Sequence, residues 1–195
     1  LGGGIKENNF LGKGIKLNSN LQVSDRSIKG QFIYEKPNFN YSDNTLFTSL
    51  RSTTTDNIKD FGYKTSDLGF SLGTTFEQFE NLYFSPEVDF SIEKLKTTST
   101  ASTSKKKQEG NYFDTYFNYS LVYDLRNKSF RPDEGFRNSF SQELPIMSDN
   151  YEILNSFETT RYQKISEMVT KVSFYGKAIN TLSGDDVRIS KRLFI

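Results

Sequence analysis

Residues 111–124 read NYFDTYFNYSLVYD, a stretch in which large apolar side chains alternate with smaller or polar ones. Five large side chains share one parity of the stretch: Phe113, Phe117, Tyr119, Leu121 and Tyr123. Successive side chains of a β-strand point to opposite faces, so the alternation predicts a strand with one apolar and one polar face. The stretch is also longer than the about 5–6 residues that are usual for strands of soluble proteins.

The same period of two recurs on both sides of this stretch. Apolar residues share a parity in three further groups: Ile28, Phe32 and Tyr34; Phe136, Phe140 and Leu144; Met168, Val172 and Phe174. Clusters of Gly, Pro, Asn, Asp and Ser separate the alternating runs and predict turns. We therefore expect an all-β chain with strands at residues 3–9, 13–24, 27–36, 45–55, 63–78, 82–96, 111–124, 135–145, 151–164 and 167–180, and a last strand that opens near Val187.

Composition excludes several classes of function. Lys and Arg number 25 and Asp and Glu 24, so the chain lacks the basic excess of a nucleic-acid-binding domain. It has no His and no Cys, which removes cysteine nucleophiles, serine–histidine chemistry, and histidine or thiolate metal sites. We expect no enzymatic activity, no cofactor, no metal site and no nucleic-acid partner.

Two architectures fit long alternating strands. One is a transmembrane β-barrel with apolar residues outside and polar residues inside, and the other is a soluble sandwich with one buried face. Alternation alone does not separate them, although the polar parity, rich in Lys, Asp, Asn, Ser and Thr, suits a water-filled lumen. The short turn at 24–27 and the long segment 97–110 also suit a barrel with short turns opposite longer loops.

The segment 97–110, TTSTASTSKKKQEG, is of low complexity. It predicts a flexible, solvated loop. A second interpretation is that its lysine run, residues 105–107, contacts anionic lipid headgroups or polyanionic sugars. Elsewhere, no apolar run approaches the about 20 residues of a membrane-spanning helix.

Three segments resemble one known family. The pattern D-x-R-x-x-x-F-x-P-x-x-G is formed by Asp124, Arg126, Phe130, Pro132 and Gly135. It resembles a hairpin midway through the barrel of the outer-membrane assembly factor BamA and its superfamily. Residues 6–14, KENNFLGKG, resemble the family's first hairpin, and residues 186–195 resemble the strand that leads into its large extracellular loop.

The resemblance implies that residues 1–195 are the N-terminal portion of such a barrel, about ten of about 16 strands. Alone, this portion would be an open curved sheet. POTRA domains would precede it, and the C-terminal part of the barrel would follow. The implied function is to fold and insert nascent outer-membrane proteins through a lateral gate at the first strand. The implied partners are those proteins, accessory assembly lipoproteins and the lipid bilayer, in the bacterial outer membrane.

Two other functions stay open at this point. One is a polypeptide-translocating pore of the same superfamily. The other is a soluble β-rich binding or adhesion module, which would bury the same apolar parity in a sandwich core.

The first strand carries the expected gate. Three consecutive glycines weaken strand pairing, and an open strand edge can pair with an incoming strand. The alternative is an ordinary flexible lead-in from an upstream domain. The candidate gate residues are Gly2, Gly3, Gly4, Ile5, Glu7 and Asn9.

The remaining candidates concern the middle hairpin and the lipid. Asp124 and Arg126 share a parity, so they lie on one face and can pair with each other or with charges across the lumen. Pro132 fixes φ and Gly135 permits φ above zero, which predicts a tight turn at 132–135. The residues expected to face lipid are Phe113, Phe117, Tyr119, Leu121, Phe136, Phe140, Leu144, Val172 and Phe174.

Overall fold

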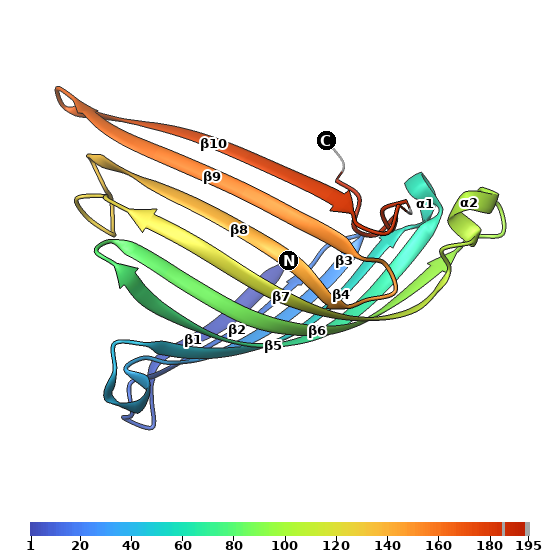
Figure 1. Cartoon of the computed structure of the whole chain (residues 1–195), viewed down its shortest axis with the longest axis horizontal. Coiled ribbons are helices and arrows are strands. Elements are labelled where there is room, and N and C mark those ends of the chain that lie inside the picture. Colours follow the sequence, from blue (N-terminus) through green and yellow to red (C-terminus); the bar gives the residue numbers. More distant parts are fainter. Residues whose placement is uncertain (185, 194–195) are drawn as a thin grey trace.

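A computed structural model describes residues 1–184 and 186–193. Ten strands form a single curved sheet (Figure 1), as the alternation predicts. Their bounds are β1 Gly2–Phe10, β2 Ile15–Val23, β3 Ser27–Lys36, β4 Thr45–Asn57, β5 Tyr63–Phe79, β6 Leu82–Thr97, β7 Gly110–Asp124, β8 Gly135–Met147, β9 Glu152–Ile165 and β10 Met168–Thr181.

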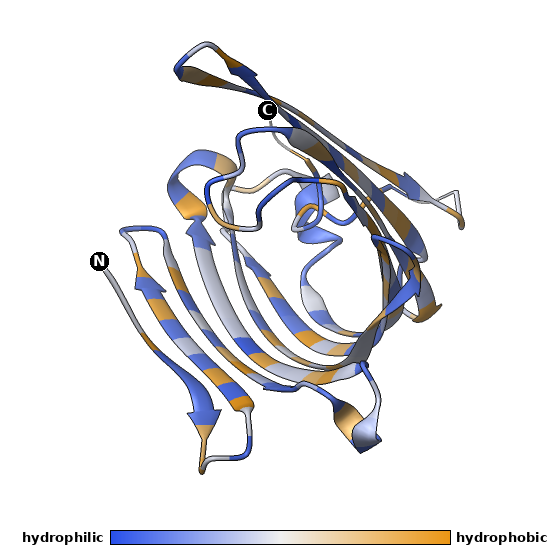
Figure 2. Ribbon diagram, turned by 90° about the vertical axis from the view of Figure 1, so that its left-hand side faces the viewer, coloured by the Kyte–Doolittle hydropathy of each residue, from blue (hydrophilic) through white to orange (hydrophobic). Residues whose placement is uncertain are grey.

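The sheet is a simple antiparallel meander. Each strand pairs with the next one in the sequence, in the order β1 to β10, and β1 and β10 form its two edges. β5 and β6 are the longest strands, with 17 and 16 residues. The end-on view shows a trough that does not close (Figure 2). The predicted all-β, open and curved architecture is confirmed.

The connections gather at two ends of the trough. The helices α1 (Ile58–Phe61) and α2 (Thr103–Lys106) join β4 to β5 and β6 to β7, and we call their end the helical end. The opposite end, the hairpin end, carries the β1–β2, β3–β4, β5–β6, β7–β8 and β9–β10 connections, among them the short helix η1 (Phe39–Tyr41). No helix in residues 1–184 or 186–193 is long and apolar enough to cross a membrane.

The sequence suggested that the turn at 24–27 and the segment 97–110 lie at opposite ends of the barrel. The structure instead places them at the same end. Both join an even-numbered strand to the next odd-numbered one, so a meander places both at the helical end. The segment 97–110 also has specific contacts. Lys105 Nζ donates to the Phe61 carbonyl oxygen at 2.7 Å, and Thr97 Oγ1 donates to a Glu109 carboxylate oxygen at the same distance.

The cross-strand register separates two faces with different chemistry. Residues directly opposite each other share a face, and one such row joins Phe84, Leu121, Phe140 and Phe157 from β6 to β9. The row beside it on the other face joins Ser85, Ser120, Ser141 and Ser156 by similar register steps. Bands of opposite hydropathy accordingly alternate along the strands (Figure 2). The apolar rows lie on the convex face and the polar rows on the concave face.

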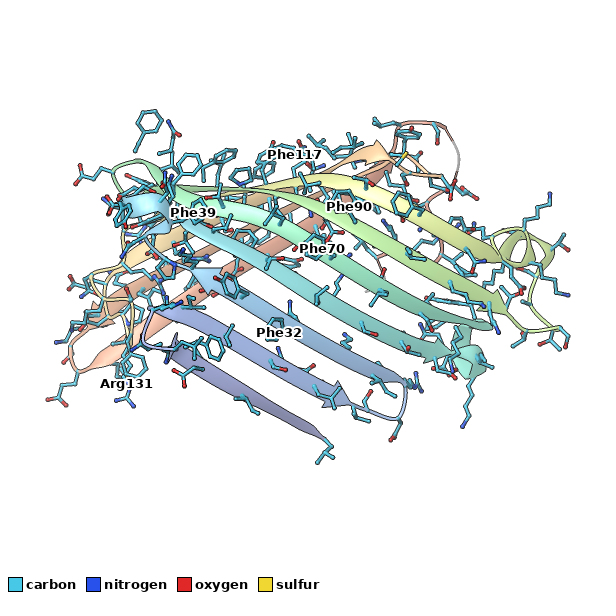
Figure 3. The ribbon with its side chains drawn as sticks, turned by 90° about the horizontal axis from the view of Figure 1, so that it is seen from below. Phe32, Phe39, Phe70, Phe90, Phe117 and Arg131 are labelled. Atoms are coloured by element: carbon cyan, nitrogen blue, oxygen red, sulfur yellow. The ribbon has the colours of Figure 1, made fainter. Side chains whose placement is uncertain are left out.

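Aromatic rings cross the convex face from strand to strand. Phe76 and Phe84 have ring centroids 5.7 Å apart, Phe84 and Tyr119 6.1 Å, and Tyr119 and Phe140 6.2 Å. Figure 3 labels other aromatic residues of this face, including Phe70, Phe90 and Phe117. Edge-to-face and tilted ring pairs at these separations are favourable, so the ladder also holds the strands in register.

The chain after β10 differs from the prediction. A strand was expected to open near Val187, but residues 186–193 contain no strand. They turn back onto the concave face, where Ile189 packs with Tyr63, Leu95 and Tyr112. Burial of Ile189 in this small core and of the neighbouring Arg188 among charged partners holds the backbone away from the edge of β10. The predicted strand also included residues 194–195, which lie outside the described residues.

Candidate functional site

β1 is the most exposed strand of the sheet. All nine of its residues are exposed, and within the described chain it pairs with β2 alone. The register runs from Gly2 opposite Gln22 to Glu7 opposite Leu17, and it shifts before Phe10. The outer edge of β1 therefore offers backbone N–H and C=O groups to a further strand.

The candidate gate residues play different local parts. A Cβ atom at Gly4 would lie 2.9 Å from the Ser19 carbonyl oxygen, whereas one at Gly3 would meet nothing within 4 Å. Glu7 Oε1 accepts the Asn9 N–H at 2.8 Å, and Asn9 Oδ1 accepts the Gly14 N–H at 2.7 Å. Glu7 and Asn9 thus shape the register shift and the hairpin that follow the glycines, while the glycines leave the start of β1 without side chains.

The concave face carries an ion-pair network that spans three strands. Arg51 of β4 lies directly opposite Gly69 of β5. Its Nη2 donates to Asp89 Oδ1 of β6 at 2.8 Å, its Nη1 contacts the other Asp89 oxygen, and its Nε donates to Asp67 at 3.2 Å. Asp89 is 8% exposed, so the carboxylate depends on Arg51 for compensation of its charge.

A second network anchors the segment after β10. The guanidinium of Arg188 bonds Asp114 through both Nη atoms, at 2.7 and 3.1 Å, and Glu93 at 2.8 Å. Its backbone N–H donates to Glu152 at 2.6 Å, and its guanidinium carbon lies 3.8 Å from the centroid of the Tyr112 ring. We call Arg188, Glu93, Asp114, Glu152 and Tyr112 the anchor cluster. It joins this segment to β6, β7 and β9.

The anchor cluster is buried and charged. The Arg188 side chain is fully buried, and those of Glu93 and Asp114 are 7% and 1% exposed. Burial works to lower the pKa of Arg188, but the hydrogen bonds to Asp114 and Glu93 outweigh it and raise that pKa above its ordinary value. Arg188 therefore stays protonated. Removing one partner of such a pair leaves the other as an uncompensated buried charge.

Both networks border a groove on the concave face, beside the segment 186–193 that folds back onto this face. Its volume is about 550 Å³, and its walls include Arg51, Asp67, Glu87, Asp114 and Lys177. Within residues 1–184 and 186–193, no group of three or more acidic side chains is placed to hold a metal ion. The walls of the groove are polar and carry charges of both signs, so the groove suits water and polar segments of polypeptide.

Sequence reasoning missed these networks. The sequence prediction singled out none of Arg51, Asp67 and Asp114 as a functional residue, and Arg188 appeared only within a predicted strand. Arg188 and Glu93 are 95 positions apart in the sequence. The available signal was that charged residues recur on the polar parity of β4 to β7, but the identity of their partners depends on the register and on the fold of residues 186–193.

The middle hairpin differs from its prediction in one respect. Asp124 and Arg126 do pair, with Arg126 Nε and Nη2 bonded to the two carboxylate oxygens at 2.8 and 2.6 Å. Gly135, the first residue of β8, has a φ of +95°, in the positive range that was expected of it. The tight turn at 132–135 is wrong, however, because β7 and β8 are joined by the wider loop 125–134.

Side-chain hydrogen bonds explain the wider loop. Asn127 Oδ1 accepts the backbone N–H groups of Asp133 and Glu134 at 3.2 and 3.3 Å, and Asn127 Nδ2 contacts the Asp133 carboxylate. Asp133 also pairs with Lys128 at 3.0 Å. Phe130 projects from the loop and is 79% exposed. These contacts join the two sides of the loop, and Pro132 lies between the residues that make them.

The nine residues expected to face lipid lie on the convex face. Cross-strand pairs such as Phe117 with Leu144 and Leu121 with Phe140 place them on one side of the sheet. Val172 and Phe174 of β10 are 64% and 61% exposed. The prediction of a common face is thus consistent with the register, and their contact with lipid stays a prediction.

The fold defines the class of the protein. A long-stranded antiparallel meander with an apolar convex face and a charged concave face is the architecture of a transmembrane β-barrel. The solved structure of BamA from Haemophilus ducreyi lacking POTRA domains 1–3 has a similar fold, with a TM-score of 0.78 at 20% sequence identity. The match covers 97% of this chain and 40% of that one, so the chain corresponds to part of that barrel.

Sequence comparison identifies the family. The Omp85 superfamily domain matches residues 9–195, and the chain belongs to this superfamily. No curated protein matches the chain. The chain thus belongs to the Omp85 superfamily and spans less than half the length of the BamA structure that it matches.

Proposed function

We propose that this chain is the N-terminal barrel portion of an outer-membrane assembly factor that folds and inserts nascent β-barrel proteins. In this proposal, the client strand adds to the edge of β1. The partners are nascent outer-membrane proteins, with accessory assembly lipoproteins acting on the complete protein. The observation that carries the proposal is the make-up of β1, a strand of nine residues whose three consecutive glycines leave its start without side chains.

The composition of β1 supports its role as a gate. β1 has nine residues, whereas β10, the other edge of the sheet, has 14. Gly2, Gly3 and Gly4 contribute backbone hydrogen-bonding groups and no side chains, so the seam they form with the last strand of a barrel would be weak. A weak seam exposes an edge on which an incoming strand gains main-chain hydrogen bonds.

The convex face supports a location in the membrane. Its large side chains are exposed in the central strands, for example Leu68 at 59%, Ile92 at 54% and Phe113 at 45%. Monomeric soluble proteins rarely expose contiguous apolar patches of this kind. This observation weighs against the soluble binding module, which would have to cover the same face.

A crosslinking experiment tests the gate. The chain has no cysteine, so Ile5→Cys introduces a single thiol on β1 in this part of the full-length protein. Opposite residues of paired strands have Cβ atoms about 4.5–5.5 Å apart, close to the separation that a disulfide needs. We expect Ile5→Cys to form a disulfide with a cysteine in the terminal strand of a client that is being assembled.

Ile92→Cys is the matched control. Ile92 also lies on the convex face, but β6 is paired on both sides, so it offers no free backbone edge. The proposal requires a client crosslink at Ile5 and none at Ile92. Client assembly at a normal rate with no crosslink at any tested position of β1 would contradict it.

The polar groove favours a second candidate function. A superfamily member that translocates polypeptides needs a hydrated interior, and the groove beside Arg51 and Asp67 is lined by charged side chains. The two functions differ in the final location of the client protein. An assembly factor leaves its client embedded in the membrane, whereas a pore releases it on the far side, and protease protection of the client distinguishes these results.

A further inference from the structure

Three lysines lie together on the convex face at the helical end. They are Lys64 of β5 and Lys94 and Lys96 of β6, and we call them the lysine patch. Lys64 stands directly opposite Lys96, and Lys94 stands opposite Ser66. Lys94 and Lys96 are exposed, and the Lys64 side chain is 42% exposed.

The lysine patch borders the apolar part of the same strands. Along β6, the residue on the convex face that follows Lys94 is Ile92, and its cross-strand partner on β7 is Phe113. Along β5, Lys64 is followed by Ser66 and then Leu68 on the same face. Residues two positions apart on a strand lie about 6.6 Å from each other. Along each strand, the convex face therefore changes from lysine ammonium groups to apolar side chains within one or two steps of two residues.

The positive charges are poorly compensated within the protein. Lys64 lies 3.6 Å from Asp56, and the described residues provide no ion pair to Lys94 or Lys96. Like charges directly opposite each other destabilise a sheet, so the Lys64–Lys96 pair is unfavourable for the sheet by itself. An anion bound between the two ammonium groups would remove this repulsion.

The lysine run at residues 105–107 is a weaker candidate. Lys105 and Lys106 of α2 donate their ammonium groups to the carbonyl oxygens of Phe61 and Ser99, at 2.7 and 2.6 Å. Two of its three charges thus hold the loop together. Lys64, Lys94 and Lys96 instead project from paired strands beside the apolar band.

We propose that the lysine patch binds the phosphate headgroup of an anionic phospholipid, in the membrane leaflet nearest α1 and α2. The inference rests on the proposed membrane location of the convex face. The acyl chains of the lipid would lie along Leu68, Ile92 and Phe113, and its phosphate would lie among the three ammonium groups. Long lysine side chains near a membrane boundary reach toward headgroups in this way.

The test measures which lipids stay with the protein. The full-length protein is reconstituted into nanodiscs of phosphatidylcholine and phosphatidylglycerol in equal amounts, and the lipids retained after mild detergent release are quantified by mass spectrometry. We expect the wild-type protein to be enriched in phosphatidylglycerol. The variant Lys64→Gln/Lys94→Gln/Lys96→Gln should lower this enrichment by about fivefold or more.

Two further variants show whether position or net charge decides the result. Lys13→Gln/Lys164→Gln/Lys171→Gln removes the same charge from exposed residues at the hairpin end, and it should keep the enrichment. Lys94→Gln/Lys96→Gln leaves the contact between Lys64 and Asp56 in place, and it serves if the triple variant does not insert. It should lose most of the enrichment.

The outcomes separate this inference from the proposed function. Equal enrichment in the wild-type protein and in the lysine-patch variants overturns the inference, as does an equal loss in the hairpin-end variant. In both cases the protein is still in the membrane, and the proposed function stands. Failure of the wild-type protein to enter nanodiscs at all would overturn the proposed membrane location and the inference with it.

Discussion

The guanidinium of Arg51 lies over the backbone of Gly69. The two residues are directly opposite each other on β4 and β5, and a Cβ atom at Gly69 would come within 2.6 Å of Arg51 Nη2. Because Gly69 has no side chain, Arg51 extends across β5 and reaches Asp89 on β6. One missing side chain therefore allows an ion pair between strands that are not neighbours.

Gly69→Ala should weaken this ion pair. The new methyl group would push the guanidinium away from Asp89, and we expect a loss of about 1–3 kcal/mol in the free energy of unfolding. Urea-induced unfolding of the full-length protein in lipid vesicles measures it. Gly176→Ala is the control, because a Cβ there meets only the Phe174 ring at 3.6 Å. Equal effects of the two substitutions would show that glycine flexibility, and not the arginine, determines the stability.

Arg188→Ala should detach the segment that follows β10. Glu93 and Asp114 would keep buried charges without their partner, at a cost of roughly 3–5 kcal/mol. Hydrogen exchange of residues 187–192 and urea unfolding are the measurements, and faster exchange is expected in that segment before global unfolding. Arg192→Ala is the control, since the Arg192 side chain pairs with the exposed Asp186 at 3.7 Å and donates to the Val187 carbonyl oxygen at 2.9 Å, two contacts that lie within the segment itself. Unchanged exchange in Arg188→Ala would mean that other contacts, such as the burial of Ile189 and the bond from Lys191 to Tyr116, hold the segment without the Arg188 side chain.

Phe140→Arg should prevent insertion of the barrel into bilayers. Phe140 lies on the convex face between Leu121 and Phe157, and an arginine facing lipid near the membrane midplane costs about 2–4 kcal/mol. Folding into vesicles, followed by the mobility shift of the folded form on gels, measures the effect. Ser139→Arg places the same residue on the concave face of the same strand, and it should insert normally. If both variants insert equally well, the assignment of faces is wrong.

The β7–β8 loop should loosen in acid. Hydrogen bonds from Asn127, and then from Lys128, hold the pKa of Asp133 below its ordinary value. A lowered pKa means that the charged form stabilises the loop. The stabilisation is complete above the ordinary pKa of about 3.9 and is lost as the pH falls through the lower pKa of the folded state.

Hydrogen exchange of residues 127–134, measured between neutral and strongly acidic pH, follows this change. Asp133→Asn should loosen the loop already at neutral pH and remove the pH dependence. Glu134→Gln is the comparison, because Glu134 contributes its backbone N–H and not its carboxylate to the Asn127 contact. A wild-type loop whose protection, corrected for the intrinsic pH dependence of amide exchange, is the same at all pH values would contradict the assigned role of Asp133.

Much of the fold followed from the sequence. Alternation such as that of Phe113, Phe117 and Leu121 places side chains on two faces whatever the neighbouring strand is, because the period of a strand is local. The predicted strands overlap all ten observed ones. The pairing of Asp124 with Arg126 was also accessible because the two residues are only two positions apart, although Arg126 lies just beyond the end of β7 and not on the strand.

Other features could not be predicted in this way. Alternation near Val187 suggested a strand, but residues 187–193 instead fold onto the concave face. The contacts that hold them there come from β5, β6, β7 and β9, and nothing local to the segment encodes them. The wider loop at 125–134 likewise depends on Asn127 reaching the backbone of Asp133 and Glu134.

The sequence by itself determined the all-β class, the two-faced strands and the resemblance to a family of outer-membrane barrels. The tertiary structure alone decided which charges meet: Arg51 with Asp89 across Gly69, Arg188 with Glu93 and Asp114, and Lys64 opposite Lys96. The physical reason is the distance along the sequence over which each feature is determined. Strand periodicity is set by bonds between adjacent residues, whereas an ion pair needs a register and a curvature that only the assembled sheet provides.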